Sequence, residues 1–185
     1  MNILVILVLQ IIAILLILII ILSMWKRVPA DKAAVIIGRK KRVVSGGGTL
    51  LVPIIERMNV ITLESISLAV NSKGAKTSQG VPINVDAVAI VKVRNTEKDV
   101  FMAFEHFHAG KDDLTRKRIE DAAISVLEGK LCEIVGTLTV EKIYIDREAF
   151  SNRVREAVEV DLQVMGLKLV SFAIKEISDE KSSLP

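Results

Sequence analysis

The chain has 185 residues, of which 51% are hydrophobic, and its formal net charge at pH 7 is +3. Its mean hydropathy of +0.46 is too high for an ordinary soluble domain, so an apolar segment is expected outside the folded core. The single cysteine, Cys132, excludes an internal disulfide framework and fits a reducing compartment. We expect this thiol to lie opposite the apolar stripe of its helix, partly exposed, where a silent role is favoured over lipidation.

An apolar segment opens the sequence. From Ile3 to Leu22 every residue is Ile, Leu, Val or Ala except Gln10. Twenty helical residues span about 30 Å, which is the thickness of a bilayer's hydrocarbon core. No basic start or small-residue cleavage site marks a signal peptide, and Trp25 resembles an interfacial anchor. Residues 1–25 are therefore predicted to form one transmembrane helix, in which Gln10 is a tolerated polar residue or bonds to a neighbouring helix.

Positive charge is concentrated just after this segment. Between residues 26 and 60 the net charge is +6, whereas the rest of the chain carries −3. The positive-inside rule then places the N-terminus outside the cell and the remainder in the cytoplasm. A polybasic segment also attracts anionic lipid, at about 1 kcal/mol per cation near the surface. We expect six cations to contact the lipid surface: Lys26, Arg27, Arg39, Lys40, Lys41 and Arg42.

The stretch RKKRVVSGGGTLLVP, residues 39–53, joins four of these cations to three glycines. Phosphate-binding loops also use glycines, but they lead into a helix, whereas this stretch leads into β-forming residues and Pro53. Neither GxxxxGK[ST] nor GxGxxG is present. A glycine turn between two strands is therefore favoured over nucleotide binding. Lipid contact by the cations and a solvated hairpin tip that protects a sheet edge both remain open.

Strands are predicted for the next part of the chain. After a juxtamembrane linker at 26–32, we expect a strand from Ala33 to Gly38 and a second from Leu50 to about Leu63. Ile66 to Val70 predicts a third, followed by NSKGAKTSQG, residues 71–80, which is rich in turn formers.

One long strand is predicted over residues 81–95. Apolar side chains occupy every odd position from 81 to 93, which indicates burial of one face: Val81, Ile83, Val85, Ala87, Ala89, Val91 and Val93. Val88 and Ile90 interrupt the polar side, so the middle of the second face is also expected to be covered.

Helices follow these strands. Asn95 or Thr96 can cap a helix running towards His106, and Asp112 or Asp113 can cap a longer one that ends at Gly136. The longer helix carries an apolar stripe at helical spacing: Ile119, Ala122, Ala123, Val126, Leu127, Leu131 and Ile134.

The pattern then predicts a short helix over residues 139–145, a third helix capped by Asp146 and ended by Gly166, and a final strand over residues 167–177. The third helix carries an apolar stripe on one side: Phe150, Val154, Ala157, Val158, Leu162 and Met165. Strands come first and helices later, without βαβ alternation. The sequence therefore predicts an α+β domain over residues 33–179 with a mainly antiparallel sheet, followed by a tail at 180–185.

No catalytic or metal site is predicted. Glu105, His106 and His108 lie close together, but the chain has no further histidine, so a polar helix end is favoured over a metal site. No GxSxG elbow is present, and the basic cluster lacks the interleaved aromatic residues of nucleic-acid binding. We expect no enzymatic activity, no cofactor and no nucleic-acid partner.

The motifs together resemble a known family. VPADKAAVIIG, GGGTLLVPIIE, SQGVPINVDAVAIVKV, VLEGKLCEIVGTLTVEKIYIDREAF and GLKLVSFAIKEISD follow an N-terminal membrane segment in this order. They resemble the SPFH (stomatin/prohibitin/flotillin, band 7) domain, most closely that of prokaryotic flotillins, from Val28 to Asp179.

The resemblance implies a non-enzymatic scaffold that oligomerises on the membrane and organises microdomains, often beside an NfeD-type membrane protein. Flotillins usually continue into a long coiled coil, whereas this chain stops at KSSLP, so we expect a fragment or a short member. The alternative function is a prohibitin- or stomatin-like regulatory subunit of a membrane protease or transporter. The cytoplasmic orientation favours the scaffold, because protease modulators place their domain on the opposite side of the bacterial membrane.

Overall fold

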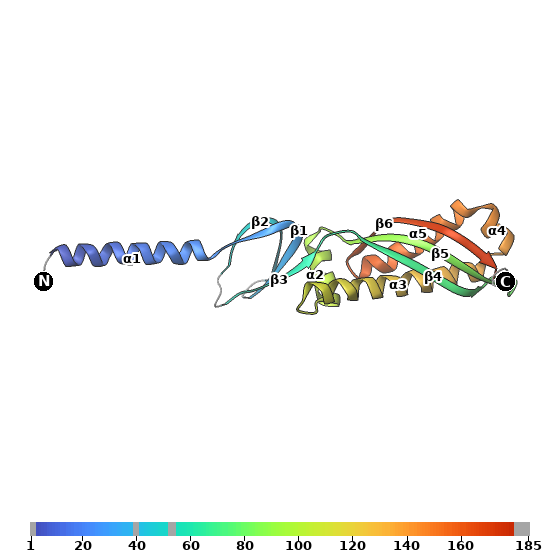
Figure 1. The fold of residues 1–185 in the computed structure, drawn as a ribbon, viewed down its shortest axis with the longest axis horizontal. Helices are drawn as coiled ribbons and strands as arrows, with labels where there is room; N and C mark the ends of the chain where they lie inside the picture. Colours follow the sequence, from blue (N-terminus) through green and yellow to red (C-terminus); the bar gives the residue numbers. More distant parts are fainter. Residues whose placement is uncertain (1–2, 39–40, 52–54, 180–185) are drawn as a thin grey trace, which may run out of the picture. The chain divides into compact units, whose positions relative to one another are not determined.

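The computed structural model describes residues 3–38, 41–51 and 55–179 (Figure 1). The chain divides into two compact units, Met1–Val60 and Ile61–Pro185. Each unit contains one three-stranded sheet, and the division falls within the third strand. The prediction of an α+β chain with antiparallel sheets is confirmed, but the single domain expected over 33–179 consists of two units.

The first unit begins with α1 (Ile3–Ser23) and continues into the sheet β2-β1-β3. Strand β1 spans Trp25–Ile37 and pairs antiparallel with β2 (Arg42–Leu50), while β3 spans Arg57–Thr62. Residues 26–32, which the sequence predicted as a linker, lie within β1, and Trp25 to Val28 pair with β2. Only residues 29–32 leave the register, as a bulge opposite Gly46.

The three glycines lie inside β2 and do not form the turn between two strands that the sequence predicted. The reversal between β1 and β2 falls instead between Ile37 and Arg42. Gly46 has φ of +65° and Gly47 of +104°, values that side chains with a Cβ disfavour. These two glycines therefore allow β2 to change direction while its hydrogen bonds to β1 continue on both sides.

The second unit is built on the antiparallel sheet β4-β5-β6, formed by β4 (Ile66–Lys76), β5 (Pro82–Val93) and β6 (Leu167–Asp179). The predicted alternation is confirmed from Ile83 to Val93, where each odd-numbered side chain is buried, but Val81 lies before β5 and is 37% exposed. The predicted turn-rich segment 71–80 is mostly strand, because Asn71 and Ser72 pair with β5. Gly74, at φ of +68°, provides a bulge that lets the ladder continue to Lys76.

Between β5 and β6 the described chain forms four helices: α2 (Glu97–Phe107), α3 (Asp112–Thr137), α4 (Val140–Ile145) and α5 (Arg147–Val164). Of the two alternatives, Thr96 caps α2, and Thr139 and Asp146 cap α4 and α5. The expected cap on α3 is wrong, because Lys111 holds the cap position. Asp112 and Asp113 lie in the first turn of α3, where their negative charges interact favourably with the helix dipole.

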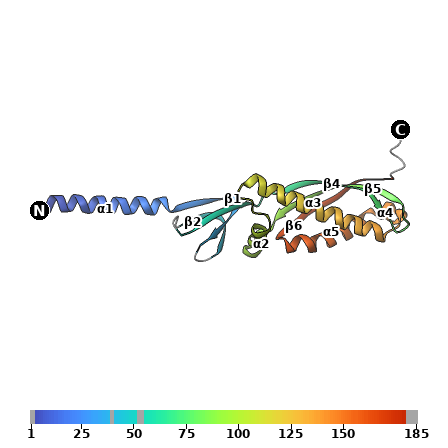
Figure 2. The same cartoon turned by 90° about the horizontal axis from the view of Figure 1, so that it is seen from below.

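Helices α3 and α5 cover one face of this sheet (Figure 2). Helix α3 packs on β4, α5 packs on β6, and the two helices contact each other. The core between them contains the predicted apolar stripes of both helices, including Leu127, Leu131, Val154, Val158 and Leu162, none of which is exposed. The hydrophobic effect of this one covered face holds the second unit together.

Candidate membrane-facing surface

Helix α1 exposes its apolar side chains. Every large one from Leu7 to Ile19 is about half exposed or more, Leu22 is 66% exposed, and Gln10 is exposed beside them. The side chain of Ile3 lies outside the described residues. Within the part of the chain that the structure describes, no helix has both the length and the sustained apolar character needed to cross a bilayer.

The end of α1 is joined to the first sheet by regular pairing. Leu51 N donates to Met24 O at 3.0 Å, and Trp25 pairs with Leu50 in the register of β1 and β2. The Trp25 side chain is 59% exposed and lies against Gly48, where an added Cβ would come within 2.8 Å of Trp25 Nε1. The third glycine of the motif therefore provides room for the indole ring just beyond the helix.

The change of direction at Gly46 and Gly47 brings the two ends of β2 together. Arg42 Nη2 donates to Leu50 O at 2.7 Å, although these residues stand at opposite ends of the strand. A straight strand would separate them by roughly 27 Å, far beyond the reach of one side chain. Because Leu50 pairs with Trp25, Arg42 lies close to the end of α1 instead of at the far end of an extended hairpin.

A carboxylate also holds Arg42. Its Nη2 lies 3.0 Å from Glu56 Oε2, and the Arg42 side chain remains 43% exposed. Gly38 permits this approach, because a Cβ there would come within 2.8 Å of Glu56 Cγ. The cation is partly neutralised by this pair, so its role is structural as well as electrostatic.

Exposed apolar residues lie near Arg42 in the first sheet. Leu50 is 52% exposed, and Ile55, which precedes Glu56, is 64% exposed. The "junction surface" is defined here as the exposed residues at the end of α1 and the nearby end of the first sheet: Leu22, Trp25, Lys26, Arg27, Arg42, Leu50 and Ile55. Apolar and aromatic side chains interleaved with cations are typical of surfaces that meet the headgroup region of a bilayer.

The structure brings only part of the predicted lipid surface together. Lys26 and Arg27 are exposed on β1, and Arg42 joins them through the fold of β2. Lys41 is exposed as well, whereas Arg39 and Lys40 lie outside the described residues. Sequence reasoning missed Leu50 and Ile55. The run LLVPII, residues 50–55, contains no polar residue, so its pattern does not indicate which side chains face outwards.

The remaining polar clusters serve the fold. His108, which the sequence placed in a polar helix end, stacks on Phe104 with ring centroids 4.4 Å apart. Among the residues that the structure describes, no three His, Cys, Asp or Glu side chains are placed to hold a metal ion. Cys132 is exposed, as expected, and its Sγ lies 3.2 Å from Ser72 Oγ.

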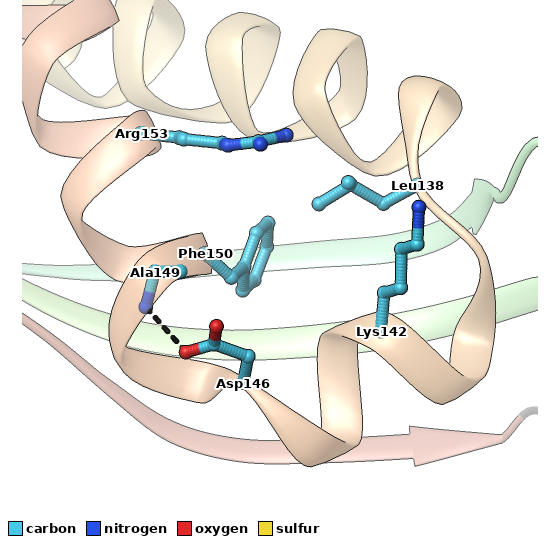
Figure 3. A pocket seen from close by; sticks show the side chains of 6 residues that line it. All are labelled: Leu138, Lys142, Asp146, Ala149, Phe150 and Arg153. Atoms are coloured by element: carbon cyan, nitrogen blue, oxygen red, sulfur yellow. Dashed lines mark hydrogen bonds between the residues drawn. The ribbon is translucent and has the colours of Figure 1, made fainter.

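A shallow hollow of about 280 Å³ opens beside α4 and α5, lined by Leu138, Lys142, Asp146, Ala149, Phe150 and Arg153 (Figure 3). Asp146 Oδ1 accepts a hydrogen bond from Ala149 N at 3.0 Å, so the only carboxylate of the hollow caps α5. The lining therefore lacks a free carboxylate for acid–base chemistry, and the junction surface is the stronger candidate site.

Comparison with known proteins decides the family. Residues 26–183 match the family model described as the SPFH domain / Band 7 family. The chain belongs to this family. The flotillin-like protein FloT of Bacillus subtilis is 38% identical over 148 residues, which are 80% of this chain and 28% of FloT.

Flotillins of animals are also similar to this SPFH chain. Flotillin-1 of Drosophila melanogaster is 36% identical over 157 residues, which are 83% of this chain and 36% of the relative. Human flotillin-1 is 35% identical over 142 residues, which are 77% of this chain and 33% of the human protein. The chain thus spans about a third of the length of the curated relatives that it matches, and the resemblance to flotillins predicted from its motifs is confirmed.

Proposed function

We propose that this SPFH protein is a membrane-anchored, flotillin-like scaffold that oligomerises and organises membrane microdomains and their protein partners. The observation that carries the proposal is the junction surface, which presents Trp25, Leu50 and Ile55 beside cations at the end of an apolar helix. The similarity to flotillins supports a scaffold rather than an enzyme.

In this proposal α1 spans the cell membrane once and the rest of the chain faces the cytoplasm. The apolar run from Ile3 to Leu22 and the net charge of +6 in residues 26–60 support this orientation. The junction surface then lies at the cytoplasmic leaflet, where Lys26, Arg27 and the RKKR run contact anionic headgroups. An NfeD-type membrane protein is the proposed protein partner.

The chain contains one tryptophan, so Trp25 is a built-in probe of its own depth in the bilayer. The purified chain would be reconstituted into vesicles whose lipids carry bromine either near the headgroup or near the chain ends. We expect stronger quenching of Trp25 fluorescence by the bromines near the headgroup, because indole rings favour the interface. Equal fluorescence with and without brominated lipid would contradict the proposed membrane contact.

Charge is tested separately by the double substitution Lys26→Gln and Arg27→Gln. In vesicles with anionic lipid this variant should show less quenching of Trp25 by headgroup bromines, and added salt should reduce quenching in the parent likewise. Lys98→Gln with Lys117→Gln removes two exposed cations from the second unit and serves as the matched control. An equal loss in both variants would indicate a general effect of net charge.

Orientation is tested by labelling an engineered cysteine at Ser183 with a membrane-impermeant reagent, in a chain carrying Cys132→Ser. We expect labelling only after the cells are opened. Labelling in intact cells would show that the C-terminal part of the chain lies outside the cytoplasm. That result would favour the alternative function, a regulatory subunit of a membrane protease.

A further inference from the structure

We infer that the hollow beside α4 and α5 is a docking site for a partner protein, and that it takes a peptide segment in which a carboxylate side chain stands next to a large apolar one. This inference goes beyond the proposed function, which rests on the junction surface, and it does not depend on that function. Five of the six lining residues belong to the motif VLEGKLCEIVGTLTVEKIYIDREAF, residues 126–150, which the junction surface does not use.

The base of the hollow is apolar, and hydrogen bonds hold its frame. Leu138 and Phe150 are buried beneath the exposed side chains of the lining. The Leu138 carbonyl accepts hydrogen bonds from Ser78 N at 3.0 Å and from Ser78 Oγ at 2.9 Å. Thr139 caps α4 and Asp146 caps α5. A frame that is already ordered costs little conformational entropy when a ligand binds to it.

The turn between α4 and α5 is also attached to the sheet. Tyr144 Oη donates to Ile177 O at 2.9 Å, and Arg147 Nη2 donates to Lys175 O at 3.3 Å. Both contacts lead to β6, so the helices on either side of the turn are fixed to the same strand.

Two cations stand at the sides of this apolar base. Lys142 comes from α4 and Arg153 from the second turn of α5, and Figure 3 shows them on two sides of the Phe150 ring. Within the described part of the chain, neither side chain takes part in an ion pair or a hydrogen bond. Asp146 is the one anion of the lining, so the lining carries a net charge of +1.

The wider surroundings of the hollow are neutral. From residue 141 to residue 156 the chain carries four cations and four anions: Lys142, Arg147, Arg153 and Arg155 against Glu141, Asp146, Glu148 and Glu156. A neutral region does not attract a polyanion over a long distance, because the opposite charges cancel beyond about 10 Å. The attraction is therefore local, which favours a single carboxylate placed between Lys142 and Arg153 over nucleic acid or an anionic bilayer.

The volume limits the size of the occupant. Sites that enclose a drug-sized ligand measure about 300–1,000 Å³. This hollow is shallow and measures about 280 Å³, so it accommodates one or two side chains of a larger partner. The planar guanidinium of Arg153 is suited to bind a carboxylate through two parallel hydrogen bonds. An apolar side chain next to that carboxylate would cover Leu138 and Ala149.

The test uses the full chain in detergent with ¹³C-labelled leucine and alanine methyl groups. Leu138 and Ala149 line the hollow, so their methyl signals report its occupancy directly. The probe is the capped dipeptide acetyl-Glu-Phe-amide, titrated through the millimolar range in which small surface contacts bind. We expect saturable shifts of both signals. Acetyl-Gln-Phe-amide, which lacks the charge, should bind about fivefold more weakly.

Charge substitutions show whether the two cations cause this preference. Lys142→Gln with Arg153→Gln should remove the preference for the acidic peptide. The matched control is Lys117→Gln with Arg155→Gln, which neutralises two exposed cations on α3 and α5 and should keep the preference. Unchanged methyl signals of Leu127, in the core, would show that each variant is folded.

Unmoved signals of Leu138 and Ala149 with every peptide would overturn the inference. Equal binding of the acidic and the neutral peptide would do the same, as would a double variant that keeps the preference. Inorganic phosphate at the same concentrations should bind more weakly than the acidic peptide. Equal shifts with phosphate would overturn the peptide as occupant, because an anion without an apolar group would suffice. No bilayer is present in this test, so its failure would leave the proposed membrane contact untouched.

Discussion

In the first sheet, the course of β2 depends on backbone conformation: Gly46 and Gly47 adopt positive φ, and Arg42 then reaches Leu50 at the other end of the strand. In the sheet β4-β5-β6, by contrast, the strands follow a regular alternation of buried and exposed side chains under two helices. Glycine conformation therefore determines the shape of the first sheet, whereas apolar packing stabilises the second. Substitutions in the two units should therefore differ in size and in the probe that reports them.

Two intrinsic probes allow the units to be followed separately. The single tryptophan, Trp25, belongs to the first unit, and the single tyrosine, Tyr144, belongs to the second, where its hydroxyl donates to Ile177 O at 2.9 Å. Guanidinium unfolding in detergent can thus be monitored by each fluorophore in turn.

The largest effect is expected for Gly166→Ala in the second unit. Gly166 has φ of +75°, and a Cβ there would clash with the backbone oxygen of Asp99. The strain and the backbone clash together should lower the free energy of unfolding by about 4 kcal/mol, measured through Tyr144. Gly129→Ala is the control, because Gly129 lies within α3 with nothing near its Cβ, and it should raise stability by up to about 1 kcal/mol.

The next effect concerns the core itself. Leu127 on α3 has no exposed surface, so Leu127→Ala should lower the free energy of unfolding of the second unit by about 3 kcal/mol through lost burial and a cavity. Ile145 is 85% exposed, and Ile145→Ala should change stability by less than about 0.5 kcal/mol. Equal losses of stability for the two substitutions would contradict the view that buried apolar packing stabilises the second unit.

A smaller effect is expected for Gly47→Ala in the first unit. No atom lies within 4 Å of the added Cβ, so the cost comes only from the left-handed backbone and should be about 1 kcal/mol. The unfolding transition seen by Trp25 should shift while that seen by Tyr144 stays unchanged. A shift of the Tyr144 transition alone would show that the glycine bend does not control the first sheet.

The smallest effect is expected at Lys130 on the surface of α3. Its ammonium donates a hydrogen bond to Glu133 and lies 3.5 Å from Asp161, and these partners raise the pKa of Lys130 above its ordinary value of 10.5. A raised folded-state pKa contributes stability below pH 10.5 and loses it as pH rises through the folded value. Lys130→Gln should therefore lower the unfolding midpoint slightly at pH 8, and this difference should shrink as the pH rises above 10.5.

A larger effect of Lys130→Gln at high pH than at pH 8 would contradict the contacts of Lys130 with Glu133 and Asp161. Because the Lys130 ammonium lies at the surface, where water and salt screen its contacts, any difference at pH 8 should approach the precision of the measurement.

Much of the fold could be predicted from the sequence because its signals are local. The alternation in residues 81–93 predicted the buried face of β5, and the apolar stripes predicted the buried faces of α3 and α5. Thr96 and Asp146 act as the expected caps. The N-terminal apolar run and the cations after it are equally plain in the sequence. These features depend on the period of side chains along one element, which tertiary contacts did not alter.

Only the tertiary structure decided how these elements meet. The glycine motif predicted a turn, but the pairing of Trp25 with Leu50 keeps the glycines inside a strand, and their positive φ folds that strand back. The junction surface arises in the same way, from a register between residues far apart in the chain. Local patterns determine which face of an element is apolar, whereas register depends on pairing across the whole unit, and a single sequence does not encode it locally.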